Sequence, residues 1–446
     1  MMSGAKYRLQ CLGLDIGFRP WFIRPAAAAV TLLATLLRPF DRSRALWLLT
    51  VAHRIAARGW TVPRQPGEAK RIRRLTAAIA ASLEKAEALP PVGFNGTPLD
   101  CQSADTAGIV LKAPIRKDGG VEKGVILLKY SHRIAAFQRA VNMYALLEHY
   151  RIVLEPSWTG YSHLAYLSFT RYREHPIVIL APFQGDREFI DAIGQNLIAI
   201  ELGPGDWVDP SVFRPLPSEP KRYDAVFVAR WNHVKRHDLL LRAMRRLGDA
   251  RFRVALAALN TRLDRGREAI LRSIRAHGMG GQFDILEDLP AAEVNRVLNQ
   301  AKVNVLLSRQ EGGNRGIFEG FFAGVPGLVM RGHIGVRTEH IVPETGRLFD
   351  LPSLASELFY FRDHWEEFAP RPWALDHIAP AVSAARLNEV LRGLALREGE
   401  PWTVDIVAKA NRPGVGYYPG PEEGRGLPSI DGIVREYGRE RVGRGR

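Results

Sequence analysis

The sequence has very little cysteine. Its 446 residues include only Cys11 and Cys101, which are too few for a disulfide framework or a structural zinc cluster. Proteins of reducing compartments have this composition. We therefore expect the protein to be cytoplasmic.

The sequence also lacks a long hydrophobic run. The strongest candidate, residues 26–37, has little more than half of the ~20 residues that a membrane span needs, and Arg24 and Arg38 bound it. No small-residue cleavage site separates this run from the apolar segment 45–52, which disfavours a signal peptide. We predict neither a spanning helix nor a secretory leader.

Acidic residues are outnumbered, with 47 Asp and Glu against 62 Lys and Arg and a net charge of +15. This charge favours an anionic partner, which is a nucleic acid, a membrane surface or a phosphorylated substrate. Zinc-finger spacing, aromatic-basic RNA motifs and a heptad-linked basic region are all missing, so we expect no nucleic-acid partner. An Asp-x-Asp pair for a divalent metal is missing too. We expect no metal requirement and no cofactor.

The patterning of the chain predicts four regions. Residues 1–104 are helical and basic, and residues 105–205 and 206–400 alternate short β-branched runs with helical patterns. Such alternation is typical of βαβ units on a parallel sheet, and the Pro/Gly-rich stretch 203–220 is typical of a linker. Residues 411–446 are rich in glycine, proline and charge, which predicts a disordered tail.

The predicted strands cover both α/β regions. The strands of the first region are expected at 108–112, 124–130, 151–155, 176–180 and 196–201, and those of the second at 225–229, 251–257, 282–286, 303–307 and 327–330. The fold class is therefore α/β, with two Rossmann-like doubly wound domains facing a cleft and a helical basic N-terminal extension. Ligands bind at the carboxyl ends of the strands in such sheets.

Residues 67–89 form a basic, amphipathic pattern. Ile72, Leu75, Ile79 and Leu83 recur at helical spacing, and basic residues crowd the start of the segment. The pattern fits a helix on an anionic membrane surface and equally fits a helix packed on the next domain. Both alternatives remain open from the sequence.

The segment 308–329, SRQEGGNRGIFEGFFAGVPGLV, is the strongest candidate site. Glu311, Gly312 and Gly313 fall in the loop between an expected strand and an expected helix, where backbone N–H groups can approach an anion such as phosphate. Glu319 follows in the first turn of the helix. A carboxylate accepts two hydrogen bonds from a vicinal diol, so two carboxylates around a phosphate loop favour a nucleotide sugar.

Arg230 and Lys235 form a second candidate group. Arg230 follows the first strand of the second α/β region, and Lys235 precedes the next helix. Both should emerge at the same sheet edge as the glutamate loop, where fixed cations can neutralise a diphosphate leaving group. In the absence of an Asp-x-Asp pair, these cations are the expected counter-charge.

These motifs together resemble the retaining glycosyltransferases of family 4, the group 1 transferases with the GT-B fold. The 308–329 stretch resembles the Glu-x7-Glu motif with its trailing Gly-x-Pro, and Arg230 with Lys235 resembles the Arg-x4-Lys motif. Residues 207–213 resemble the Gly-Val-Asp-x3-Phe linker, and residues 343–349 the T-G-x-L turn. The resemblance covers about residues 203–350.

The resemblance implies a role for each matching residue. Arg230 and Lys235 would contact the diphosphate, and Glu311 would touch the donor sugar. Gly312 and Gly313 would offer backbone N–H groups, and Glu319 would hold the ribose hydroxyls. Asn314, which stands where the family has a glycine, is included in the predicted donor-binding set. No protein base is implied, because in this family the departing phosphate is thought to take the acceptor proton.

The implied activity is retaining transfer of a sugar from a nucleoside-diphosphate sugar to a glycan, lipid-linked or other hydroxyl acceptor, as in bacterial polysaccharide biosynthesis. The alternatives are a sugar-nucleotide epimerase or hydrolase of the same fold and a non-catalytic glycan-binding relative. Peripheral contact with an anionic membrane at the inner face of the cell is expected as well. The family's first glycine-rich loop is not evident, and the roles of His132 and His163 stay open.

Overall fold

The computed structural model describes residues 4–60, 67–83, 108–117, 120–156, 161–182, 184–194, 196–260, 266–412 and 414–438. The chain forms two compact units. Unit 1 comprises Met1–Ile16, Gly203–Ser383 and Ala410–Gly414, and unit 2 comprises Gly17–Leu202, Ala384–Lys409 and Val415–Arg446. Cys101 lies outside the described residues.

Unit 1 contains a six-stranded parallel sheet with the order β10-β9-β8-β11-β12-β13. The strands are β8 (Ala225–Val228), β9 (Val254–Ala258), β10 (Phe283–Glu287), β11 (Asn304–Leu306), β12 (Gly327–Met330) and β13 (Gly346–Phe349). They are short and almost wholly apolar, as expected for parallel strands covered on both faces. The chain adds strands in one direction from β8 to β10 and in the other from β11 to β13, so this sheet is doubly wound as predicted.

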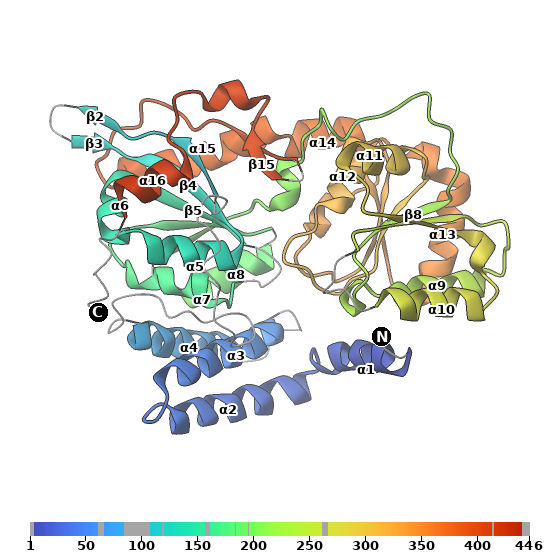
Figure 1. Cartoon of the computed structure of the whole chain (residues 1–446), viewed down its shortest axis with the longest axis horizontal. Coiled ribbons are helices and arrows are strands. Elements are labelled where there is room, and N and C mark those ends of the chain that lie inside the picture. Colours follow the sequence, from blue (N-terminus) through green and yellow to red (C-terminus); the bar gives the residue numbers. More distant parts are fainter. Residues whose placement is uncertain are drawn as a thin grey trace, which may run out of the picture. The chain divides into compact units, whose positions relative to one another are not determined.

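Helices cover both faces of this sheet, with α9 and α10 on one face and α11 and α12 on the other (Figure 1). The helices of unit 1 are α1 (Gly4–Ile16), α9 (His237–Leu247), α10 (Arg267–Ala276), α11 (Ala291–Asn299), α12 (Gly316–Phe322), α13 (Leu354–His364) and α14 (Pro370–Ile378). The buried residues of α9, including Leu240 and Met244, are spaced to face the strands.

Unit 2 contains a five-stranded sheet with the order β1-β4-β5-β6-β7. The strands are β1 (Gly108–Lys112), β4 (Gly124–Lys129), β5 (Tyr150–Glu155), β6 (Ile177–Leu180) and β7 (Leu197–Ile200). The second Rossmann-like α/β unit is present, but its winding differs from the expectation. The four strands from β4 to β7 are parallel and follow one another in a single direction, and β1 is antiparallel to β4. Among the described strands, this sheet therefore shows no reversal of the kind that defines a doubly wound sheet.

The helices that connect these strands are α5 (Ser131–Ala140), α6 (Met143–His149), α7 (Leu164–Leu167) and α8 (Gln184–Ile193). Of these, α5, α7 and α8 lie between the sheet and the helices Arg42–Trp60 and Glu68–Leu83 of the same unit (Figure 1). A small hairpin of β2 (Ile115–Lys117) and β3 (Gly120–Glu122) precedes β4.

The predicted helical N-terminal extension is present, although its first helix, α1, belongs to unit 1 and the other three belong to unit 2. Tyr7 and Cys11 of α1 enter the core of unit 1. The following helices, α2 (Pro20–Leu37), α3 (Arg42–Trp60) and α4 (Glu68–Leu83), belong to unit 2. There α2 packs on α3, α3 on α4, and α4 on α8.

Helix α4 resolves the two alternatives left open for residues 67–89. Ile72, Leu75, Ile79 and Leu83 are all buried in the core of unit 2, so this apolar face packs on the protein, and residues 84–89 lie outside the described part. Helix α2 is longer than the apolar run that the sequence analysis singled out. Within the described residues it is the one helix long and apolar enough to cross a membrane by length and composition.

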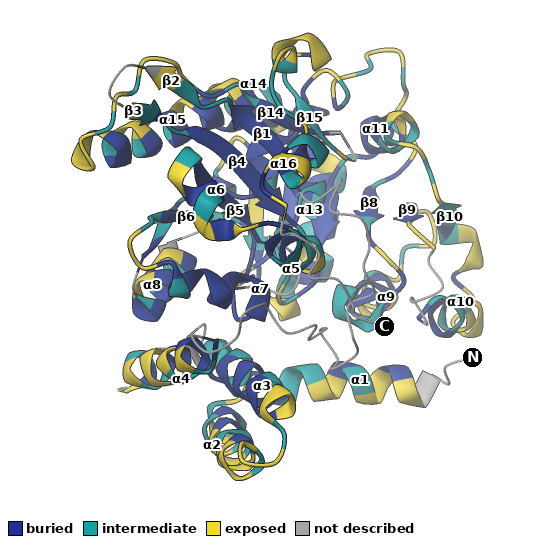
Figure 2. Cartoon of the chain, turned by 60° about the vertical axis from the view of Figure 1, so that its left-hand side comes forward, coloured by how far each residue is buried: buried dark blue, intermediate teal, exposed yellow. Residues whose placement is uncertain are grey.

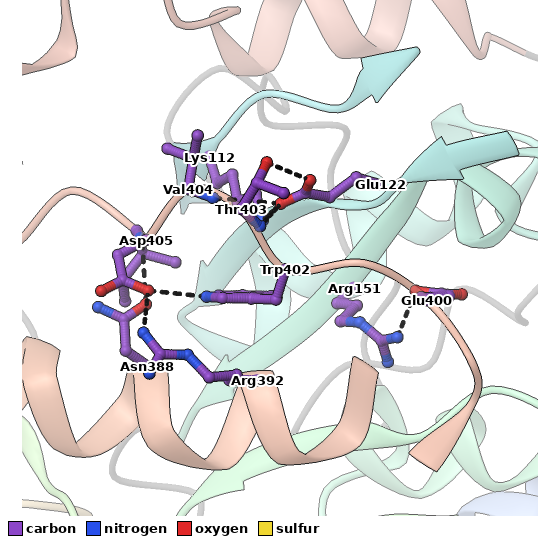
Figure 3. A network of polar contacts seen from close by, with 11 residues as sticks. Lys112, Glu122, Arg151, Asn388, Arg392, Glu400, Trp402, Thr403, Val404 and Asp405 are labelled. Carbon is purple, nitrogen blue, oxygen red and sulfur yellow. Dashed lines mark hydrogen bonds and ion pairs between the residues drawn. The ribbon is translucent and has the colours of Figure 1, made fainter. Parts of the chain in front are cut away.

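The end of the chain returns to unit 2 after Ser383, so the expected domain limit at residue 400 is wrong. Helix α15 (Pro380–Arg397) leads into a polar network that ties the returning segment to the sheet (Figure 3). Glu122 lies 2.6 Å from Lys112 Nζ and accepts hydrogen bonds from the backbone N–H and hydroxyl of Thr403, both at 2.7 Å. The Lys112 ammonium also sits 3.6 Å from the centre of the Trp402 ring.

The predicted disorder of residues 411–446 is also wrong for the part that the structure describes. The segment contains β14 (Lys409–Arg412), β15 (Gly414–Tyr417) and α16 (Ile430–Glu436), and residues 439–446 lie outside the description. Ile430, Ile433 and Tyr437 join the core of unit 2, and the Tyr417 hydroxyl donates to the carbonyl of Val110 at 2.9 Å. Composition suggested disorder because the few apolar residues of the segment find their partners only in a distant part of the chain.

Candidate functional site

The candidate site lies in unit 1 at the point where the winding of the sheet reverses. Strands β8 and β11 are neighbours, with Asn304 paired to Val226. From them the chain turns toward opposite edges of the sheet. The two loops that follow their carboxyl ends therefore flank the position where open α/β sheets bind ligands. The first loop carries Lys235, and the second carries Glu311.

Lys235 and Glu311 form an ion pair across this position. Lys235 Nζ lies 2.6 Å from Glu311 Oε1, and the two side chains are only 15% and 11% exposed. The hydroxyl of Ser308 donates to the same oxygen at 2.6 Å, and the amide of Asn314 donates to Oε2 at 3.1 Å. Both oxygens of this carboxylate thus accept hydrogen bonds from donors on the two loops.

These contacts keep Glu311 ionised. Burial would raise the pKa of Glu311, but the charge of Lys235, the nearby His333 and hydrogen bonds from Lys235 and Ser308 outweigh it and lower this pKa to about 2. A carboxylate with such a pKa is an acceptor of hydrogen bonds at neutral pH and not a proton donor. It can therefore orient hydroxyl groups or a cation.

His333 completes the network, although the sequence analysis did not select it. It follows β12, the neighbour of β11, and its Nε2 lies 3.1 Å from the Ser308 hydroxyl. Burial lowers the pKa of His333 to about 4, so the ring is neutral at pH 7. Its Nδ1 is buried and has no hydrogen-bond partner among the described residues. A histidine three residues after the end of a strand that neighbours the glycine loop is the sequence signal that could have revealed it.

Backbone contacts between two loops hold Glu311 in place. The N–H of Glu311 donates to the carbonyl of Ile334 at 2.9 Å, and the N–H of Ile334 donates to the carbonyl of Arg309 at 3.0 Å. Gly335 makes this approach feasible, because it has φ +89° and a Cβ there would lie 1.8 Å from the Glu311 carbonyl oxygen. A side chain at position 335 is therefore incompatible with the observed loop.

The predicted glycines of the loop lie beside this network. Gly313 has φ +122°, and a Cβ there would lie 2.6 Å from Pro204 Cγ. Gly312 is half-buried between Glu311 and Gly313. Asn314 has a second contact, since its Oδ1 accepts the N–H of Ile317 at the start of α12. Asn314 thus links the start of the helix to the Glu311 carboxylate.

Glu319 lies in the first turn of α12, as predicted, and is buried. It pairs with Arg315, the N-cap residue of this helix, whose Nε lies 3.3 Å from Glu319 Oε1. Burial raises the pKa of Glu319 in spite of this partner. A buried carboxylate with a raised pKa gains from any ligand that donates hydrogen bonds to its ionised form.

Three residues that the sequence singled out remain to be placed, namely Arg230, His163 and His132. Arg230 follows β8 by two residues and is exposed at the same sheet edge. His163 is buried in unit 2, where its Nδ1 accepts the N–H of Ala165, which is a structural role. His132 is exposed and stacks on Tyr130. Within the described ranges, no group of three His, Cys, Asp or Glu side chains could hold a metal ion.

The other motif segments are structural in unit 1. Trp207 is fully buried, and Asp209 accepts from the backbone N–H and the hydroxyl of Ser211 at 2.9 and 2.6 Å. In the T-G-x-L turn, the Thr345 hydroxyl accepts the Val342 N–H at 2.9 Å. A Cβ at Gly346 would lie 2.0 Å from the carbonyl oxygen of Gly327, so glycine is needed where β13 meets β12.

Residues 209–356, which contain this network, match the family model of glycosyl transferases group 1. This segment, about a third of the chain, is similar to group 1 glycosyltransferase domains. This match agrees with the glycosyltransferase class that the sequence predicts for this region. The two predicted Rossmann-like α/β units are both present. A search of curated proteins found no match.

Solved structures with a similar chain course are distant in sequence. Sucrose-phosphate synthase from Thermosynechococcus elongatus is 14% identical, with 61% of this chain and 74% of that chain covered and a TM-score of 0.47. Anabaena Alr3699/HepE, solved in complex with UDP, is 15% identical. The alignment covers 60% of this chain and 78% of that chain, with a TM-score of 0.48. The C-terminal domain of the glycosyl transferase group 1 family protein LpcC from Francisella tularensis is 16% identical. The alignment covers 38% of this chain and 97% of that chain, with a TM-score of 0.34.

Proposed function

We propose that this glycosyltransferase moves a sugar from a nucleoside-diphosphate sugar to a hydroxyl acceptor with retention at the anomeric carbon. The observation that carries the proposal is the Lys235–Glu311 pair at 2.6 Å across the switch point of the group 1 domain. A fixed cation and a fixed carboxylate at one sheet edge suit a ligand with a diphosphate next to hydroxyl groups.

The donor is bound by groups from two loops and from the first turn of α12. Lys235 and Arg230 neutralise the diphosphate, and the backbone N–H groups of Gly312 and Gly313 approach it from the loop before α12. Glu311 accepts hydrogen bonds from the sugar hydroxyls, and Glu319 accepts them from the ribose. Lys235 exchanges part of its contact with Glu311 for the phosphate when the donor binds. Since cations supply the counter-charge, the proposal requires neither a metal nor a cofactor.

The reaction breaks the bond between the anomeric carbon and the phosphate oxygen and forms a bond from that carbon to the acceptor oxygen. The acceptor proton goes to the departing phosphate oxygen, so the reaction needs no protein base. His333 is neutral and keeps the Ser308 hydroxyl directed at Glu311. Lys235 and Arg230 stabilise the negative charge that develops on the leaving group.

The acceptor that we propose is a glycan or lipid-linked hydroxyl, with the enzyme in the cytoplasm at the inner face of the cell membrane. Polysaccharide biosynthesis in a bacterium requires this reaction. A sugar-nucleotide epimerase or hydrolase would act on the donor alone. Product analysis with and without an acceptor separates the three activities, since only a transferase needs the acceptor to form product.

The first experiment is a thermal-shift screen with UDP-, GDP- and ADP-sugars. A donor at about 100 times its dissociation constant should stabilise the protein by ~2.7 kcal/mol. We expect Lys235→Ala and Glu319→Ala to abolish turnover and to unfold at temperatures within a few degrees of the wild type. Glu344→Ala, an exposed carboxylate of the same unit, is the control and should keep full activity. Full activity of both site variants would refute the proposal, and the absence of any nucleotide binding would favour a non-catalytic relative.

A further inference from the structure

Helix α2 is apolar on two opposite faces. Its inner face packs on α3 through Ile23, Ala27 and Ala34, which are buried. Its outer face is exposed, and only 17% of the helix is buried (Figure 2). A surface helix of a soluble protein normally has a polar outer face, so this one needs an explanation.

The exposed apolar residues form one stripe. They are Trp21, Pro25, Ala28, Ala29, Leu32, Leu33 and Leu36, with Phe40 just beyond the end of the helix. Their spacing of three and four residues places them on a single face. Trp21 is 68% exposed, Leu32 and Leu36 are 61% exposed, and Phe40 is 87% exposed. Single exposed leucines are common, but a continuous apolar stripe on a helix marks an interaction surface.

The charge around the stripe is predominantly positive, and one of the flanking arginines, Arg44, pairs with Asp41 at 3.3 Å. Residues 17–60 contain seven arginines and one acidic residue, Asp41, and no acidic residue occurs between 17 and 40. Arg19 stands before the start of the helix, and Arg38, Arg42 and Arg44 follow its end, all of them exposed. An apolar face flanked by arginines complements a layer of lipid tails under anionic headgroups.

We propose that the outer face of α2 docks on an anionic lipid bilayer. The helix lies in the plane of the interface, with Trp21, Leu32, Leu36 and Phe40 buried about 5–10 Å into the headgroup and acyl boundary. The flanking arginines contact lipid phosphates. This surface differs from α4, whose apolar residues are already covered by the protein.

The packing of α2 excludes a membrane-spanning position in this fold. Its inner face is held by α3, and α3 carries His53, Arg54 and Arg58 and packs on α4. A spanning α2 would have to leave α3 and expose the core that Ala27 and Ala34 help to form. A helix that lies flat on the bilayer keeps these contacts.

A second copy of the chain is a poorer occupant of the same face. A symmetric pair would place α2 against α2, and the interface would then gather Arg19, Arg38, Arg42 and Arg44 of both copies around one apolar patch. Like charges at close range disfavour this arrangement. Anionic lipid supplies the missing negative charge.

The experiment measures binding of the full chain to liposomes by co-sedimentation, without nucleotide or acceptor. It therefore does not depend on the proposed sugar transfer. One set of vesicles is phosphatidylcholine alone, and the other contains about a third phosphatidylglycerol. We expect binding to the anionic set at low salt and weaker binding at about 1 M salt, where the Debye length shrinks to about 3 Å.

Two variants test which residues carry the binding. Leu32→Glu combined with Leu36→Glu should weaken binding by about tenfold or more, because both apolar anchors are lost and negative charge is added. The matched control is Leu396→Glu on α15, where the leucine is 64% exposed, and it should bind as the wild type does. Arg38→Gln should weaken binding to the anionic vesicles by about fivefold at low salt.

Thermal unfolding of each variant is the control for loss of fold. Because the substituted side chains are exposed, each variant should unfold at the temperature of the wild type. The proposal is overturned if the double variant binds as tightly as the wild type, or if the wild type fails to bind anionic vesicles at low salt. In the latter case, light scattering that shows a wild-type dimer and a monomeric double variant would assign the stripe to a second copy of the chain.

Discussion

Replacing Gly335 by alanine tests whether the loop after β12 positions the Glu311 carboxylate. Gly335 has φ +89°, and a Cβ there would lie 1.8 Å from the carbonyl oxygen of Glu311. An ordinary contact starts at 3.4 Å, so the Glu311 peptide must move by about 3.4 − 1.8 = 1.6 Å. Such a shift breaks the 2.6 Å contacts that Glu311 makes with Lys235 and Ser308.

The neighbouring Gly332 provides a matched control in the same loop. It has φ +71° and is exposed, and a Cβ added there would have no other atom within 4 Å. Alanine at either position incurs the same left-handed backbone penalty of about 1–2 kcal/mol. For a unit of this size, each kcal/mol lowers the unfolding temperature by about 2–4 °C. Only Gly335→Ala adds the displacement of Glu311.

The assay is the initial rate of nucleoside diphosphate release with the nucleotide sugar that stabilises the protein most in the thermal screen. A misplacement of about 1 Å costs roughly a hundredfold in rate, so kcat/KM of Gly335→Ala should fall by about a hundredfold or more. Gly332→Ala should stay within about threefold of the wild type. If Gly335→Ala and Gly332→Ala have the same activity and the same unfolding temperature, the conclusion that Gly335 positions Glu311 is refuted.

Two further predictions concern stability. The folded-state pKa of Glu311, about 2, lies below its ordinary value of 4.5, so its ion pair stabilises the fold above pH 4.5 and this contribution is lost as the pH falls toward 2. In urea unfolding, the stability difference between wild type and Glu311→Gln should therefore shrink by about 1.4 kcal/mol from pH 7 to pH 3.5, and a constant difference would contradict the assigned pKa. Ile433→Ala should destabilise the protein by about 2–5 kcal/mol, because Ile433 is fully buried in the core of unit 2. The exposed neighbour Arg435→Ala should change the stability by less than about 0.5 kcal/mol, and equal effects of the two would show that α16 does not pack as described.

The sequence was sufficient for five of the six strands of the second α/β region and for the central residues of its candidate site. Strand β12 has the predicted limits, residues 327–330, because apolar patterning is a local property of the chain. Glu311 and Lys235 were found from their positions at strand ends. The carboxyl ends of parallel strands meet at one edge, which makes their proximity predictable without coordinates.

Strand β13 and the winding of the first sheet were not predictable in this way. β13 reads GRLF, with an arginine in its middle, and it is a strand because it pairs with β12 at the edge of the sheet. The order of β4 to β7 depends on which strands become neighbours, and local periodicity carries no information about neighbours. The single winding direction of the described strands β4 to β7 therefore appeared only in the fold.

The sequence by itself determined the residue types of the candidate site, since the types and spacing of Glu311, Lys235 and the loop glycines can be read directly. Tertiary structure alone decided which residues support that chemistry and which faces stay exposed. His333 and Gly335 act on Glu311 through a loop that meets it in space. Helices α2 and α4 both carry apolar stripes, but α4 is covered by unit 2 and the outer stripe of α2 is not. Burial depends on contacts between distant segments, so no local pattern could have distinguished the two helices.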